Sequence, residues 1–137
     1  VEIRAVEDAA RSAGAREVYI IEEPMSAAIG IRLPVKDAVG SVIVDIGGGT
    51  TNIAVFNRGE TVDTTCLDIG GRLIKIDEKG NIVYVFRKIY DIAQDVNVKL
   101  ELGKKLDEKD ARKISERMAK LIFESANDKE FIGKNRA

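Results

Sequence analysis

The stretch VIVDIGGGTTNIAVF, residues 42–56, decides the fold, because three consecutive glycines separate two runs of apolar and β-branched residues. Such runs are typical of strands, so the pattern predicts strands at 41–46 and 51–57 with the glycines between them. A third strand is expected at 61–69, after a turn within NRGE. Glycine tolerates a positive φ and has no Cβ, so the loop predicts a concave nest of main-chain N–H groups that binds phosphates.

Polar residues flank this loop on both sides. The expected phosphate-binding residues are Gly47, Gly48, Gly49, Thr50 and Thr51. Asp45 precedes the glycines and carries the same sign of charge as a phosphate. We therefore interpret it as holding a divalent cation that bridges the phosphates, directly or through water.

A second acidic position lies upstream, in EVYIIEEP. Residues 17–21 predict a short buried strand, and Pro24 fits the first turn of a small helix. If this strand lies beside 41–46, Glu23 at its end points into the same mouth and orients or deprotonates an attacking water. The layout indicates metal-assisted hydrolysis of a nucleotide phosphate.

The remaining chain predicts helices and one hairpin. Residues 1–13 have helical apolar spacing, and Gly14 fits a left-handed helix end. A hairpin is expected around DEKGN, residues 77–81. The long helix near the C-terminus is expected to start at the cap Asp107, and residues 87–102 predict a helix plus a short strand.

Composition narrows the function classes. At 137 residues and 45% hydrophobic, the chain suits one compact domain or part of a larger one. Its 22 basic and 23 acidic residues form no block of like charge, which does not favour nucleic acid as a partner. There is no histidine, and the single cysteine, Cys66, is expected to pack as a small hydrophobe in a strand. No apolar run approaches the length of a transmembrane segment, and we expect a cytoplasmic protein.

Each feature also has a simpler explanation. A triple glycine in a hairpin can be a turn or bulge, and Asp45 can be a turn-starting aspartate. EEP can be only a strand end and a helix start, and Gly70 and Gly71 can form another turn. The residues alone leave both sets of explanations open.

The segments AREVYIIEEPMSAAIGIRLP and GSVIVDIGGGTTNIAVF closely resemble the actin-like ATPases, above all the bacterial rod-shape MreB type, over residues 1–57. The resemblance implies an α/β, ribonuclease H-like fold with a mixed sheet and flanking helices, of which this chain holds the second half. It places Asp45 and the glycines on the second phosphate loop, with Mg²⁺ and ATP as cofactors. It implies that Glu23 positions the hydrolytic water, that Thr50 assists it, and that Gly70 and Gly71 belong to the cofactor site.

Residues 58–125 depart from that pattern. CLDIGGRLIKIDEKGNIVYV and ISERMAKLIFE look more like the ATPase subunit of the ethanolamine ammonia-lyase reactivating factor. We expect a phosphate-loop core at 1–71 and a hairpin plus helical subdomain at 72–137. The family's first phosphate loop and its adenosine motif have no match here, so the isolated chain is expected to bind ATP weakly and to hydrolyse it slowly or not at all.

Three functions follow from these resemblances. The first is the ATP-binding part of a cell-shape filament protein, with self-association or the missing half of the fold as partner. The second is an ATP-dependent chaperone that reactivates a cobalamin-dependent lyase. The third is an inactive fragment that lacks half of the ATP cleft.

Overall fold

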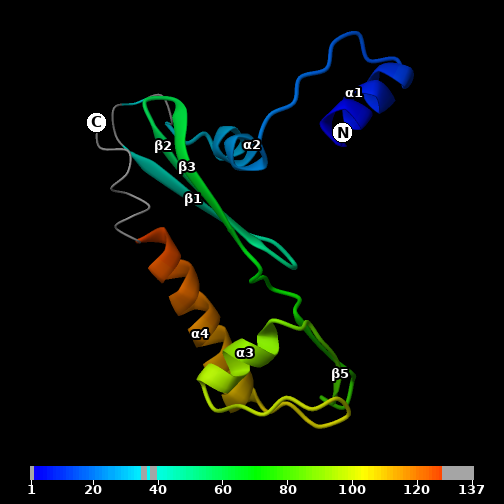
Figure 1. The fold of residues 1–137 in the computed structure, drawn as a ribbon, viewed down its shortest axis with the longest axis vertical. Coiled ribbons are helices and arrows are strands. Elements are labelled where there is room, and N and C mark those ends of the chain that lie inside the picture. The colour runs from blue at the N-terminus through cyan, green and yellow to red at the C-terminus, as the bar shows by residue number, and fades with distance from the viewer. Residues whose placement is uncertain (1, 35–36, 38–39, 128–137) are drawn as a thin grey trace.

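The computed structural model describes residues 2–34, 37 and 40–127. Along this part of the chain, helices come first, a group of strands follows, and helices come last (Figure 1). In chain order they are α1 (Glu2–Ser12), α2 (Glu23–Gly30), β1 (Ser41–Ile46), β2 (Thr51–Asn57), β3 (Glu60–Leu67), β4 (Ile74–Ile76), β5 (Ile82–Val85), α3 (Ile89–Asp95) and α4 (Glu108–Ala126). The predicted α/β class is confirmed.

The main sheet has three strands in the order β1-β2-β3, and both of its strand pairs are antiparallel. The β2–β3 turn is tight because Arg58 and Gly59 adopt left-handed conformations, with φ of 52° and 86°. The strands expected around the glycines are confirmed, since β1 and β2 pair from Ser41↔Phe56 to Ile46↔Thr51.

The strand predicted at 17–21 is wrong, because this segment has no strand pairing. Its side chains are also open to solvent, with Tyr19 80% and Ile21 56% exposed. An apolar run favours a strand, but a strand forms only where a neighbouring strand supplies hydrogen bonds and another element buries its side chains. Among the described residues, β1 is therefore an edge strand of the sheet. The expected mixed sheet would have required a parallel strand beside it.

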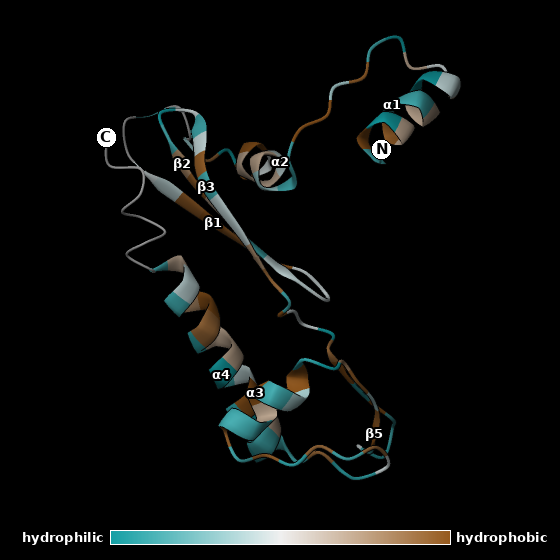
Figure 2. Ribbon diagram, viewed as in Figure 1, coloured by the Kyte–Doolittle hydropathy of each residue, from teal (hydrophilic) through white to brown (hydrophobic). Residues whose placement is uncertain are grey.

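The two faces of the sheet join different cores, and the second face is only partly covered, since Val42 and Val44 of β1 are exposed on it. On one face α2 packs through Ala28 against Ile43, Ala54 and Phe56. On the other face Ile53 joins the larger core, which includes Ile114 of α4. Alternation along the strands sends neighbouring residues to opposite faces, so β2 serves both cores. Figure 2 shows the apolar stretches of β1 and α4 that border this second face.

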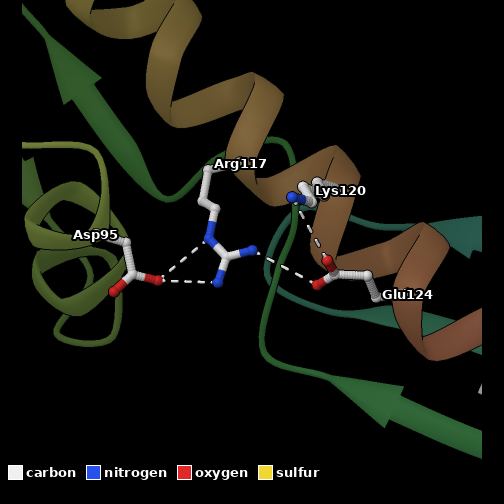
Figure 3. Close-up of polar contacts among 4 residues, drawn as sticks. All are labelled: Asp95, Arg117, Lys120 and Glu124. Atoms are coloured by element: carbon white, nitrogen blue, oxygen red, sulfur yellow. Dashed lines mark hydrogen bonds and ion pairs between the residues drawn. The ribbon is translucent and has the colours of Figure 1, made fainter.

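Charged side chains join the two helices of the C-terminal part. Arg117 on α4 donates from Nε and Nη2 to one oxygen of Asp95, at 3.1 and 3.0 Å, at the end of α3 (Figure 3). Its other terminal nitrogen reaches Glu124 at 3.5 Å, and Lys120 lies 3.8 Å from the same carboxylate. The predicted cap of α4 is confirmed, because the Asp107 carboxylate accepts from the Asp110 N–H at 2.8 Å.

Other sequence predictions have mixed outcomes. The helix end at Gly14 is confirmed with φ of 97°, and α1 has no buried residue and lies apart from the sheet (Figure 1). The hairpin is confirmed as β4 and β5. The short strand expected within 87–102 is wrong, since α3 is followed by irregular chain whose Val98 and Leu100 enter the core. The division at residue 71 stays a prediction.

Candidate phosphate-binding site

The glycine loop joins β1 to β2 at one end of the sheet. The Gly47 N–H donates to the Thr50 carbonyl at 2.8 Å, which closes the turn. Among the described residues, the N–H groups of Gly48 and Gly49 donate to no backbone acceptor. Both residues are exposed at the tip of the hairpin.

The loop differs from the predicted nest in one respect. None of its three glycines has a positive φ, so it does not need glycine for its backbone conformation. A Cβ added at Gly49 would meet nothing within 4 Å. The chain itself therefore leaves the space over Gly49 empty, and a ligand can approach the main chain there more closely than a side chain would permit.

The segment Gly70-Gly71-Arg72 packs against the glycine loop and donates hydrogen bonds to it. The Gly71 N–H donates to the Gly47 carbonyl at 2.9 Å, and the Arg72 N–H donates to the Gly48 carbonyl at 2.8 Å. Gly70 is buried, and a Cβ there would lie 2.7 Å from backbone atoms of Gly48 and Gly49. This close approach gives Gly70 a packing role, and direct contact of Gly70 or Gly71 with a cofactor stays a prediction.

The two threonines after the glycines have different environments. Thr50 is exposed and lines a pocket with Gly48 and Gly49. Thr51 is fully buried, and its hydroxyl donates to the Ile69 carbonyl at 2.7 Å. The expected placement of Thr51 beside the phosphates is therefore wrong, because strand alternation turns its side chain into the core.

Asp45 and Glu23 lie on the same side of the sheet. Asp45 is half-buried and pairs across the strands with Asn52, so both side chains point to the face covered by α2. The Asn52 amide donates to a Glu23 carboxylate oxygen at 3.5 Å. Glu23 reaches this position as the first residue of α2 rather than as the end of a strand. Asn52 was not identified as a site residue from the sequence, although it directly follows the two threonines.

A pocket of about 380 Å³ lies beside this face. Glu22, Glu23 and Asn52 line it together with Cys66. Cys66 is exposed, so the expected packed position is wrong. In the β2–β3 register it opposes Asn52. Within the described ranges, no three His, Cys, Asp or Glu side chains converge to hold a metal.

A second pocket, of about 490 Å³, opens directly on the glycine loop. Gly48, Gly49 and Thr50 form one wall, and Arg72 and Lys75 lie among the other lining residues. These two cations were missed in the sequence. The sequence did contain a signal, since Arg72 directly follows the glycine pair 70–71 and Lys75 alternates with apolar residues in the next strand.

Comparison with known proteins supports this architecture. The sequence model of the family described as ethanolamine utilisation protein EutA matches residues 30–134. The cell shape-determining protein MreB of Haemophilus influenzae is 58% identical over 71 residues, which are 52% of this chain and 20% of that protein. The cell shape-determining protein Mbl of Bacillus subtilis is 33% identical over 102 residues, covering 73% of this chain and 31% of that protein.

A solved structure extends the comparison to nearly the whole chain. The crystal structure of MreB 5 of Spiroplasma citri bound to AMPPNP has a TM-score of 0.64 at 22% identity. The match covers 99% of this chain and 47% of that chain. The chain thus spans from a fifth to about half of the length of these relatives.

These matches define the class of protein first: the chain has the fold of the actin-like ATPases. Within that class, it belongs to the family of the ethanolamine utilisation protein EutA, and 71 of its residues align with MreB at 58% identity. In the part of the chain that the structure describes, no helix has the length and apolar character needed to cross a membrane.

Proposed function

We propose that the chain is the ATP-binding part of an actin-like ATPase, with the glycine loop as its phosphate site. The N–H groups of Gly48 and Gly49 carry this proposal, because they have no backbone acceptor among the described residues and two backbone hydrogen bonds from 71–72 hold the loop in place. Because these donors are already held in place, binding of an anion costs little free energy of reorganisation. The AMPPNP bound to the Spiroplasma citri relative supports a nucleotide as the ligand.

The donor set near the loop fits a magnesium nucleotide. Mg²⁺ in nucleotide sites commonly takes one or two carboxylates, with water and phosphate oxygens completing the shell. Asp45 is a single half-buried carboxylate at the end of β1, which suits that pattern. When bound, the ion would neutralise charge that develops on the phosphates.

Glu23 is the proposed base in this scheme. Its hydrogen bond from Asn52 holds the carboxylate toward the same face as Asp45. An exposed carboxylate in this position can accept a proton from an attacking water or orient it. The exposed hydroxyl of Thr50 lies beside the loop and is proposed to assist that water.

For the whole protein, we propose a cell-shape filament protein of the MreB type. The 58% identity over 71 residues supports this role, because the matched stretch is long and the identity is high. In such a protein ATP would govern self-association. Since the chain spans only a fifth of that relative, we expect the isolated chain to turn ATP over slowly or not at all.

The second candidate is an ATP-dependent chaperone that reactivates a cobalamin-dependent ethanolamine ammonia-lyase. The match of the EutA family model to residues 30–134 favours it, since that match continues through the C-terminal helix. ATP-dependent sedimentation of a protein that contains this chain would support the filament. ATP-dependent release of damaged cobalamin from the lyase would support the chaperone.

Calorimetric titration with Mg-ATP tests the nucleotide proposal. We expect Asp45→Ala to weaken binding strongly in magnesium, and Glu23→Ala to bind like the unchanged chain, because Glu23 acts on water rather than on phosphate. Glu60→Ala is the control for loss of one carboxylate, since Glu60 begins β3 at the opposite end from the loop. No binding by the unchanged chain at millimolar nucleotide would overturn the proposal.

A further inference from the structure

The pocket of about 490 Å³ has two walls of different chemistry. The first wall is the glycine loop, in which the N–H groups of Gly48 and Gly49 have no backbone acceptor among the described residues. The second wall contains Arg72, Lys75 and the ring of Tyr84, which come from the segment that starts directly after Gly71 and from the β4–β5 hairpin.

The two cations of this pocket have no acidic partner among the residues that the structure describes. Neither Arg72 nor Lys75 forms an ion pair with a described carboxylate, whereas Asp68 on the same rim is already paired with Lys88. The Lys75 ammonium lies 5.5 Å from the centre of the Tyr84 ring, which holds it at the pocket by a cation–π interaction. Two uncompensated positive charges therefore lie beside unpaired main-chain donors, and both features attract an anion.

Arg72 is also tied to the loop itself. Its N–H donates to the Gly48 carbonyl at 2.8 Å, and its Cδ lies 3.5 Å from where a Cβ on Gly48 would be. The aliphatic part of the Arg72 side chain thus lies against Gly48, and Arg72 lines the pocket together with the loop. The planar fork of a guanidinium matches two phosphate oxygens at once, which an ammonium cannot do.

We propose that Arg72 and Lys75 are the cationic wall of the phosphate site and that Arg72 positions the phosphates of a polyphosphate anion against the glycine loop. This inference rests on the proposed function for the identity of the ligand as a nucleotide, but the anion site itself depends only on the pocket. The ligand class is a di- or triphosphate, and its source is either a nucleotide or an inorganic polyphosphate.

The test compares three variants that each remove one positive charge. Arg72→Gln and Lys75→Gln remove the pocket cations, and Arg58→Gln removes a cation at the turn between β2 and β3, at the far end of these strands from the loop. The side chain of Arg72 contributes no hydrogen bond to the fold among the described residues, so Arg72→Gln is expected to melt like the unchanged chain. Each variant is titrated with Mg-ATP and with tripolyphosphate.

We expect Arg72→Gln to weaken Mg-ATP binding about tenfold or more, because a charge-assisted hydrogen bond is lost. Lys75→Gln should weaken it less, Arg72→Lys should restore part of the loss, and Arg58→Gln should have no effect. The salt dependence of binding should also become shallower in Arg72→Gln.

The outcomes separate this inference from the proposed function. If the chain binds Mg-ATP and Arg72→Gln binds equally well, the cationic wall is wrong and the nucleotide proposal stands. If tripolyphosphate binds in an Arg72-dependent manner but ATP does not, the anion site stands and the nucleotide proposal is wrong. If neither ligand binds the unchanged chain, both are wrong.

Discussion

Replacement of Gly70 by alanine tests how the glycine loop is supported. The new Cβ would lie 2.7 Å from the carbonyl carbon and oxygen of Gly48 and from the nitrogen of Gly49. These are backbone atoms, so no side-chain rotation relieves the contact. Ordinary van der Waals contact begins at about 3.4 Å, and the two segments must separate by several tenths of an ångström.

The cost has two parts. Forcing a methyl group into packed backbone costs about 1–3 kcal/mol. Separation also lengthens the hydrogen bonds that the Gly71 and Arg72 N–H groups donate to the loop, each worth about 1 kcal/mol. We expect a total near 3 kcal/mol, about 10 °C in melting temperature for a chain of this size.

Thermal and urea unfolding followed by circular dichroism measure this loss. Gly49→Ala and Gly71→Ala are the controls, since a Cβ would meet nothing within 4 Å at Gly49 and only one atom, at 3.8 Å, at Gly71. Both should melt close to the unchanged chain. If Gly70→Ala melts within about 2 °C of these controls, the loop does not depend on the close approach at Gly70. Gly49→Ala should instead reduce Mg-ATP affinity, because its methyl group occupies the ligand's space.

Three further predictions concern other parts of the chain. Thr51→Val should cost about 1–3 kcal/mol in urea unfolding, because it leaves the Ile69 carbonyl without its buried donor, and Thr51→Ser should recover most of the loss. Asp107→Ala should cost about 1 kcal/mol and fray the first turn of α4, which amide hydrogen exchange would detect, whereas unchanged exchange there would contradict the cap. Hydrogen bonds from the Asn81 side chain and backbone lower the pKa of Asp77, so its contribution to the β4–β5 turn is present above about pH 4 and is lost as the pH falls toward the lowered pKa. An NMR titration of the Asp77 carboxyl checks this, and a pKa at or above the ordinary value would refute it.

Local sequence predicted most of the secondary structure correctly. The strands on either side of the glycines, the turn at Arg58 and Gly59, and the cap at Asp107 all depend on residues within a few positions of one another. Propensity, turn chemistry and capping operate over that distance. The segment 17–21 failed for the opposite reason, because a strand needs a partner that lies elsewhere in the chain.

The candidate phosphate-binding site also combines features set by local sequence with features set by contacts between distant segments. The sequence by itself determined that a loop of three glycines follows Asp45 between two strands, and that Pro24 lies in the first turn of a helix. That Glu23 belongs to this helix rather than to a strand came from the structure. Only the tertiary structure decided that Thr51 turns inward, that Cys66 is exposed and that Gly70 lies beneath the loop. It also brought Arg72 and Lys75, which have no ion-pair partner among the described residues, to the pocket. These features depend on which face of a strand another element covers, and that is set by packing between segments far apart in the sequence.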